Sequence, residues 1–204
     1  LFKDDGLDML GEQVRNFDLL KAFPNLDLKV ATDVEGYFYQ RKYGVSEEGF
    51  SYELKSPAYL GGYYDRWPLF KQYASELSLG FTPALPEDHE FQTLLKLILD
   101  AEYSCAVHIR RGDLAVYNPH YGEPLTETYF IEAVERISEA NPDTRFFFFS
   151  DDPVWVDERI TPVLAEKHLC QVVSVNDASR GYLDLYMMSL CGSFIASQGS
   201  LAKY

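Results

Sequence analysis

Apolar and polar positions in the second half of the chain follow two periods, one typical of strands and one typical of helices. Four short apolar runs have the length of buried strands, and they cover residues 104–110, 145–150, 171–175 and 193–197. Four longer segments carry apolar residues every three or four positions, and they cover residues 87–101, 127–140, 154–168 and 182–191. Apolar strands that alternate with helices predict an α/β fold with a parallel sheet.

Single residues refine these elements. Thr126 is the N-cap candidate for the helix over residues 127–140, and Tyr129 belongs to the inward face predicted for it. Pro162 has no N–H to donate, so we expect it to interrupt the helix over residues 154–168. The consecutive phenylalanines of residues 146–149 are typical of a strand buried on both faces.

The first hundred residues have a less regular pattern. Residues 7–23 show loosely helical spacing, and residues 33–56 are rich in tyrosine, glycine and charge without a repeat. Two prolines and a charge cluster in residues 81–90 mark the best boundary. We therefore divide the chain into residues 1–86 and residues 87–204.

The net charge limits the possible partners. The chain of 204 residues has 18 lysines and arginines against 32 aspartates and glutamates, a net charge of −14. Binding to nucleic acid or to anionic lipid needs basic surface, so neither is expected as a general partner. A small basic site for a phosphorylated ligand is compatible with this charge.

The cysteines and the lengths of the apolar runs indicate the cellular compartment in which the protein is expected. Cys105, Cys170 and Cys191 lie in apolar contexts without CxxC spacing, which favours buried free thiols over a disulfide or a metal site and fits a reducing compartment. No apolar run spans a bilayer, and no secretory signal is present. The chain begins at Leu1 rather than methionine, so we expect a fragment. We expect a cytoplasmic protein that associates with the inner face of a membrane only through segments outside this chain.

Polar residues end or follow three of the predicted strands, where α/β sheets bind ligands. They are His108, Arg110, Arg111, Gly112 and Asp113 at the first strand, Ser150, Asp151 and Asp152 at the second, and Ser197, Gln198 and Ser200 at the fourth. The carboxyl ends of parallel strands meet at one edge of a sheet. We therefore expect one site that carries the groups a nucleotide needs.

Each cluster leaves alternatives open. Guanidinium groups bind phosphate in pairs of hydrogen bonds, so Arg110 and Arg111 either bind a diphosphate or pair with carboxylates of the chain. Asp151 and Asp152 either cap a helix, accept from a guanine base or hold Mg²⁺. The turn after Ser197 either binds phosphate or simply joins two elements. Gly112 allows the backbone to approach a ligand closely. The side chain of His108 points either into a cleft or into a buried niche of the core.

Four segments in order resemble one enzyme family. VHIRRGD at residues 107–113 resembles the HxRRGD signature of the α-1,2-fucosyltransferases, glycosyltransferase family 11, within the wider α-1,2, α-1,6 and protein O-fucosyltransferase superfamily. FFFFSDD at residues 146–152 resembles the second motif, and residues 183–204 resemble the third. The aromatic segment at residues 59–70 is similar to an upstream motif of the family.

The resemblance implies a GT-B-like architecture of two Rossmann-like domains. Residues 1–86 would be part of the N-terminal acceptor-side domain, and residues 87–204 would be the C-terminal domain that binds the GDP-sugar. It implies an inverting transfer of L-fucose from GDP-β-L-fucose to a galactoside hydroxyl, with α-1,2 linkage, in glycan or surface polysaccharide synthesis. The implied partners are GDP-fucose and a galactose-containing oligosaccharide, with no metal and no other cofactor.

The resemblance also implies roles for single residues. Arg110 and Arg111 would bind the diphosphate, and Asp152 would accept hydrogen bonds from guanine. His108 and Asp113 would shape the fucose and acceptor side, and both are candidates for the general base. The implied catalytic residues are His108, Arg110 and Asp113, and the implied donor-binding residues are Arg110, Arg111, Gly112, Ser150, Asp151, Asp152, Ser197, Gln198 and Ser200.

Two departures from the family pattern bear on these expectations. Ser197 and Gln198 resemble the α-1,6 branch, which leaves the acceptor and the linkage open. The family's Gly-Gly-Leu-Gly-Asn-Gln loop is absent and the chain ends after the third motif, so we expect a truncated N-terminal domain and an incomplete C-terminal one. The alternative function is a noncatalytic or degenerate module that binds a GDP-sugar or a glycan. An acidic, anchor-free chain suits a bacterial enzyme.

Overall fold

The structure, a computed structural model, describes residues 22–26, 44–46, 59–61, 70–112, 114 and 123–198. The chain divides into two compact units, Leu1–Ala84 and Leu85–Tyr204. The acceptor-side and donor-side roles expected for residues 1–86 and 87–204 stay predictions.

The first unit has two short strands and one helix among its described residues. These elements are β1 (Gly44–Ser46), which pairs in parallel with β2 (Tyr59–Gly61), a 3-10 turn η2 (Lys71–Tyr73) and α4 (Ala74–Gly80). Residues 22–26 lie against the end of α4, where the Asn25 side chain donates to the Leu79 carbonyl at 2.9 Å. The helical spacing noted over residues 7–23 falls largely outside the described residues.

The second unit is built on a parallel sheet with the strand order β5-β4-β3-β6. Its strands are β3 (Ser104–Ile109), β4 (Arg145–Ser150), β5 (Leu169–Val173) and β6 (Ser193–Ile195). Its helices are α5 (His89–Leu99), α7 (Glu127–Ala140), α8 (Pro153–Arg159), α9 (Thr161–Leu164) and α10 (Gly181–Ser189), with a 3-10 turn η3 (Ala178–Arg180) before α10. The prediction of an α/β fold with a parallel sheet is confirmed.

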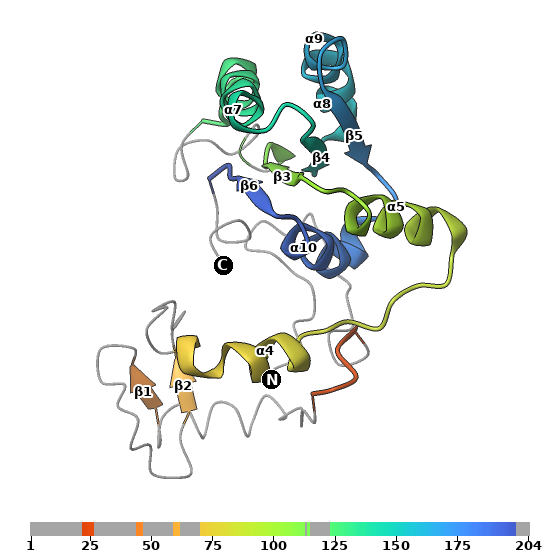
Figure 1. Cartoon of the computed structure of the whole chain (residues 1–204). Coiled ribbons are helices and arrows are strands. Elements are labelled where there is room, and N and C mark those ends of the chain that lie inside the picture. The colour runs from red at the N-terminus through yellow and green to blue at the C-terminus, as the bar shows by residue number, and fades with distance from the viewer. Residues whose placement is uncertain are drawn as a thin grey trace. The chain divides into compact units, whose positions relative to one another are not determined.

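Helices cover both faces of this sheet (Figure 1). One core cluster joins the sheet to α5 and α10, and the other joins it to α7, α8 and α9. Phe147 and Phe149 enter the first cluster, whereas Phe146 and Phe148 enter the second. Successive side chains of a strand point to opposite faces, so a strand covered on both faces has no polar position. This confirms the prediction for residues 146–149.

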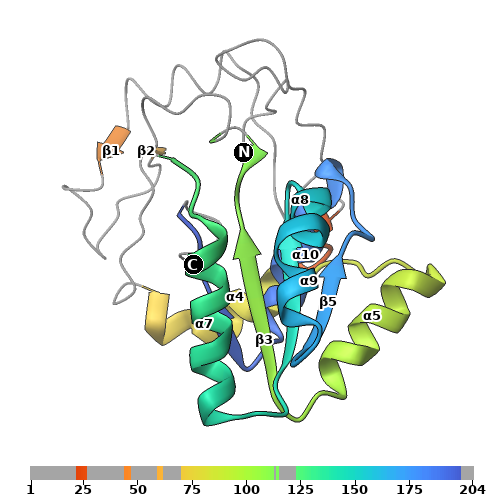
Figure 2. The same ribbon diagram turned by 90° about the horizontal axis from the view of Figure 1, so that it is seen from above.

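The chain reverses its direction across the sheet between β3 and β6. From β3 it proceeds through α7 to β4 and through α8 and α9 to β5, and α10 then returns it to β6 on the other side of β3. Figure 2 shows β3 and β5 pointing the same way, so their carboxyl ends lie at one edge. In open parallel sheets, ligands bind outside the carboxyl ends where the strand order reverses. The fold therefore points to the ends of β3 and β6.

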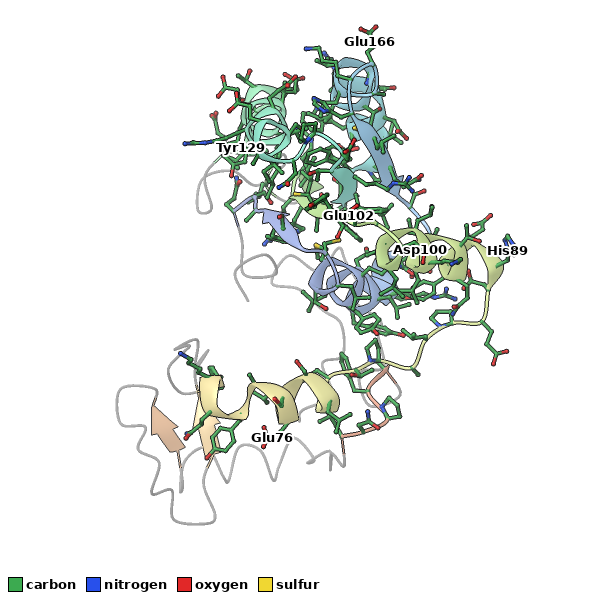
Figure 3. The ribbon with its side chains drawn as sticks, viewed as in Figure 1. Glu76, His89, Asp100, Glu102, Tyr129 and Glu166 are labelled. Carbon is green, nitrogen blue, oxygen red and sulfur yellow. The ribbon has the colours of Figure 1, made fainter. Side chains whose placement is uncertain are left out.

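Several details of the second unit differ from the sequence predictions, and one is that the fourth strand ends at Ile195 rather than at residue 197. The third strand covers Leu169–Val173 rather than residues 171–175, because its backbone pairs with the first five residues of β4 and its half-exposed start obscures the apolar run. Thr126 stands at the N-cap of α7, but its side chain makes no capping hydrogen bond. Tyr129 is 40% exposed rather than inward, and its hydroxyl donates to the Ala196 carbonyl at 2.9 Å (Figure 3).

Single residues also define two other helix ends. The helix predicted over residues 154–168 is interrupted into α8 and α9, with Pro162 in the first turn of α9. The Asp88 carboxylate caps α5 by accepting from the Phe91 N–H at 2.8 Å.

The three cysteines are free thiols, as predicted, but only Cys105 is fully buried, whereas Cys170 and Cys191 are half-buried. Burial raises the pKa of Cys105 to about 12, so this thiol stays protonated at neutral pH. No helix in the described ranges is long and apolar enough to cross a membrane. The compartment stays a prediction.

Candidate functional site

His108, Arg110 and Ser197 are tied together between the ends of β3 and β6. The Ser197 N–H donates to the His108 carbonyl at 3.1 Å, which extends the pairing of the two strands. The Ser197 hydroxyl oxygen lies 3.0 Å from His108 Nδ1 and accepts from the Arg110 N–H at 3.0 Å. His108 and Ser197 are 6% and 7% exposed. A buried polar pair therefore anchors the segment that carries the arginines, which we call the arginine turn (Arg110, Arg111 and Gly112).

Burial and two nearby charges set the protonation of His108. Burial lowers the pKa of His108 because it penalises the imidazolium, while the Asp151 charge opposes this effect and the Arg110 charge adds to it. The ring is therefore neutral at pH 7. In the tautomer whose Nδ1–H donates to Ser197, Nε2 keeps a lone pair that can accept a proton.

The side chain of Asp151 holds the backbone of the arginine turn. One carboxylate oxygen accepts from the Arg111 N–H at 2.8 Å, and the other accepts from the Gly112 N–H at 3.1 Å. A Cβ added to Gly112 would lie 2.7 Å from Asp151 Oδ2, too close for both atoms to keep their places. Gly112 therefore accommodates a carboxylate of the chain itself.

The Arg111 guanidinium lies against an aromatic ring and a carboxylate. Its Cζ is 3.9 Å from the centroid of the Trp155 ring, and its Nε is 3.3 Å from Asp152 Oδ2. The other oxygen of Asp152 accepts from the Trp155 N–H at 3.1 Å, and Pro153 takes the first position of α8. The capping alternative for Asp152 and the ion-pair alternative for Arg111 are thus both present in the structure.

Ser150 and Gln198 complete the polar edge. The Ser150 hydroxyl donates to the Ile109 carbonyl at 2.8 Å and accepts from the Asp152 N–H at 3.0 Å. Gln198 Nε2 donates to the Glu123 carbonyl at 2.6 Å, while Gln198 Oε1 is buried without a partner among the described residues. A buried polar atom without a partner costs on the order of 1–3 kcal/mol. The Gln198 side chain is therefore held at this edge through its amide nitrogen.

A cavity of about 410 Å³ lies beside the arginine turn. It is lined by Arg111, Leu114, Trp155 and residues 123–127. An aromatic ring together with the side chains of Glu123 and Glu127 suits a sugar or a base, which combine a stacking face with hydrogen-bonding groups. A second cavity of about 330 Å³ lies at the opposite edge of the sheet, where Asp100 and Glu102 follow α5 (Figure 3).

Every predicted site residue that the structure describes lies at the carboxyl edge of the sheet. Asp113 and Ser200 are outside the described residues. Among the described residues, no group of three or more His, Cys, Asp or Glu side chains is placed to hold a metal ion. The roles expected toward a donor, an acceptor or a metal stay predictions, because the contacts above join groups of the chain to one another.

Sequence reasoning did not single out Trp155, Glu123 or Glu127. Trp155 lies three residues after the Asp151-Asp152 pair, and an aromatic residue one turn into the helix that follows this pair was the available signal. Glu123 and Glu127 lie around the start of α7, where no periodicity or motif marks them.

The fold and the edge first define a class of protein. The order β5-β4-β3-β6, with a polar arginine turn where the order reverses, is that of a Rossmann-like α/β unit with its ligand edge at the ends of β3 and β6. Comparison with known families then gives the particular one. The model of Glycosyl transferase family 11 matches residues 13–203, so the chain belongs to this family.

Family membership confirms the resemblance inferred from the motifs. It supports the coarse prediction of a glycosyltransferase in a family of fucosyltransferases. Comparisons with curated proteins and with solved structures give no significant match.

Proposed function

We propose that the protein transfers L-fucose from GDP-β-L-fucose to a galactoside hydroxyl by α-1,2 linkage, with inversion at the anomeric carbon and without a metal ion. The observation that carries this proposal is the arginine turn between the ends of β3 and β6, in a chain of glycosyl transferase family 11. The two-domain GT-B architecture belongs to the same proposal, with the second unit as the side that binds the GDP-sugar.

The proposed reaction is a single displacement. A galactose hydroxyl attacks the fucose anomeric carbon on the face opposite GDP, and negative charge builds on the β-phosphate as its bond to fucose breaks. The Arg110 guanidinium stabilises this charge, while Arg111, held by Trp155 and Asp152, adds a fixed positive charge beside it. Oriented cationic donors of this kind stabilise a leaving phosphate in the transition state.

The acceptor hydroxyl loses its proton to a base in this reaction. His108 is neutral at pH 7 and can accept a proton, and Asp113 is the second candidate from the sequence. Asp152 toward guanine, and Gln198 and Ser200 toward the phosphates, complete the proposed donor contacts.

Arg110→Ala, assayed with GDP-fucose and lactose, tests the proposal. We expect kcat/KM to fall by about a hundredfold or more, because removing one oriented donor to a developing negative charge has effects of this size. Arg136→Ala removes an exposed arginine of α7 and serves as the matched control, with transfer unchanged. Transfer by Arg110→Ala within about tenfold of wild type, under about 1.4 kcal/mol of barrier, would contradict the phosphate role.

Two further outcomes separate the alternatives. Transfer that persists in EDTA supports the metal-free part of the proposal, and loss of transfer in EDTA contradicts it. GDP binding by the wild-type protein without turnover on any β-galactoside favours the noncatalytic GDP-sugar-binding module.

A further inference from the structure

The three successive backbone N–H groups of the arginine turn all donate to side chains of the protein. The Arg110 N–H donates to the Ser197 hydroxyl, and the N–H groups of Arg111 and Gly112 donate to the two oxygens of Asp151. Consecutive N–H groups in a turn are a common cradle for phosphate. In this turn the cradle is filled by side chains from the ends of β6 and β4.

We infer that Asp151 is a positioning residue, which fixes the arginine turn through two backbone hydrogen bonds so that the guanidinium groups, and not the backbone, bind the diphosphate. The inference rests on the donor-binding part of the proposed function, because it requires a diphosphate at this edge. A carboxylate that accepts two N–H bonds holds both neighbouring peptide units, and bonds to an ionised acceptor are stronger than neutral ones. Fixing these peptide units fixes the points from which both arginine side chains start.

Gly112 is the second part of this arrangement. The three heavy atoms nearest to a Cβ added there all belong to Asp151, at 2.7, 3.2 and 3.8 Å. The backbone of Gly112 is not left-handed, so alanine meets the carboxylate rather than a conformational restriction. The effect of Gly112→Ala must therefore depend on Asp151, which makes the contact measurable.

An opposite role for Asp151 is also defined by this geometry. A carboxylate on two N–H groups resembles a bound phosphate, and a ligand phosphate would then have to displace it. The two roles predict opposite effects when the carboxylate is removed. A positioning residue strengthens binding of the diphosphate, whereas a displaced competitor weakens it.

A double-mutant cycle tests the inference with four proteins: wild type, Asp151→Ala, Gly112→Ala and the double variant. The readouts are calorimetric affinities for GDP and for inorganic pyrophosphate, kcat and KM with GDP-fucose and lactose, and melting temperature. We expect each single variant to lower pyrophosphate affinity by about tenfold and to lower kcat more than KM rises, since the arginines act on charge that develops in the transition state. The double variant should be no worse than Asp151→Ala, because the added methyl group no longer meets the carboxylate.

Two more variants separate positioning from general stability. Asp151→Asn keeps one acceptor oxygen and should give an intermediate kcat, while its melting temperature stays near that of wild type. Asp157→Ala removes an exposed carboxylate of α8 and should leave both affinities and kcat unchanged. If Asp151→Ala does not fold, Asp151→Ser, whose side chain is too short to reach the position of Oδ2, alone and combined with Gly112→Ala, provides the same cycle.

Each contrary outcome has a distinct meaning. Tighter pyrophosphate binding by Asp151→Ala overturns the inference and assigns the anion to the backbone N–H groups. Additive effects of Asp151→Ala and Gly112→Ala overturn it as well, because the contact would then carry no coupling. Wild-type protein that binds GDP and pyrophosphate without transferring fucose refutes the proposed function and leaves the inference standing. Absence of binding to either ligand refutes both.

Discussion

Asp184, in the first turn of α10, is a half-buried carboxyl that lies apart from the arginine turn in sequence. Burial raises the pKa of Asp184 to about 6, although the hydrogen bond from Asn176 Nδ2 at 2.7 Å favours the ionised form. Asn176 Oδ1 is also buried and has no partner among the described residues. A proton on Asp184 therefore relieves the cost of burying its charge beside an unpaired acceptor.

The raised pKa predicts a loss of stability with rising pH. The folded state binds the Asp184 proton more tightly than the unfolded chain, whose value is 3.8, so this stabilisation is complete below about pH 4 and is lost as pH rises through about 6. The loss is about 3 kcal/mol at most, at 1.36 kcal/mol for each pKa unit. Urea unfolding between about pH 3.5 and pH 7.5 measures it. Asp184→Asn should flatten the pH dependence, whereas parallel curves for the two proteins would refute the assignment.

Individual site residues could be predicted from the sequence to different extents. Arg110 and Arg111 could be found because two adjacent guanidinium groups after an apolar strand stand out in an acidic chain. The hydrogen bond from the Gly112 N–H to Asp151 could not be predicted, since 39 positions separate the two residues and only the pairing of β3 with β4 brings them together. The same limit applies to Ser197, whose hydroxyl reaches Arg110 across 87 positions.

The N-caps of α5 and α7 allow a prediction about helix stability in which one cap serves as the control for the other. Asp88 caps α5 through a hydrogen bond to the Phe91 N–H, whereas Thr126 stands at the N-cap of α7 without one. Asp88→Ala should lower the free energy of unfolding by about 1 kcal/mol, because it leaves a helix N–H without its partner. Thr126→Ala should cost less than about half of that. Equal losses in urea unfolding would show that the capping bond of Asp88 contributes nothing.

The strands show why some elements are predictable and others are not. β4 lies between β3 and β5 and is buried on both faces, so its four consecutive phenylalanines mark it as a strand in the sequence. β5 lies at the other side of β4 with a neighbour on one side only in the described sheet, and Leu169 at its start is 54% exposed. Gln171 breaks the apolar run in the middle of the strand, and the sequence therefore places the start of β5 two residues too late. Edge strands carry this ambiguity generally because one border of the strand faces no partner.

Over the whole molecule, the charge is strongly negative, but two arginines lie at the edge of the sheet where a ligand is expected. The net charge of −14 still argues against nucleic acid and anionic lipid as partners. Arg110 and Arg111 place positive charge at the one edge where the fold locates a ligand, and Asp151 and Asp152 hold Arg111 and its backbone there. The family match runs over residues 13–203 and so includes parts of both units, while the described edge belongs to the second unit.

The central claim is that this edge binds the diphosphate of a GDP-sugar through its arginines. Calorimetric titration of GDP into the wild-type protein and into Arg110→Ala, each in EDTA, tests it most directly. We expect saturable binding by wild type and an affinity at least about tenfold weaker for Arg110→Ala, a difference of about 1.4 kcal/mol. Equal GDP affinity in the two proteins, or no binding by wild type, would contradict it.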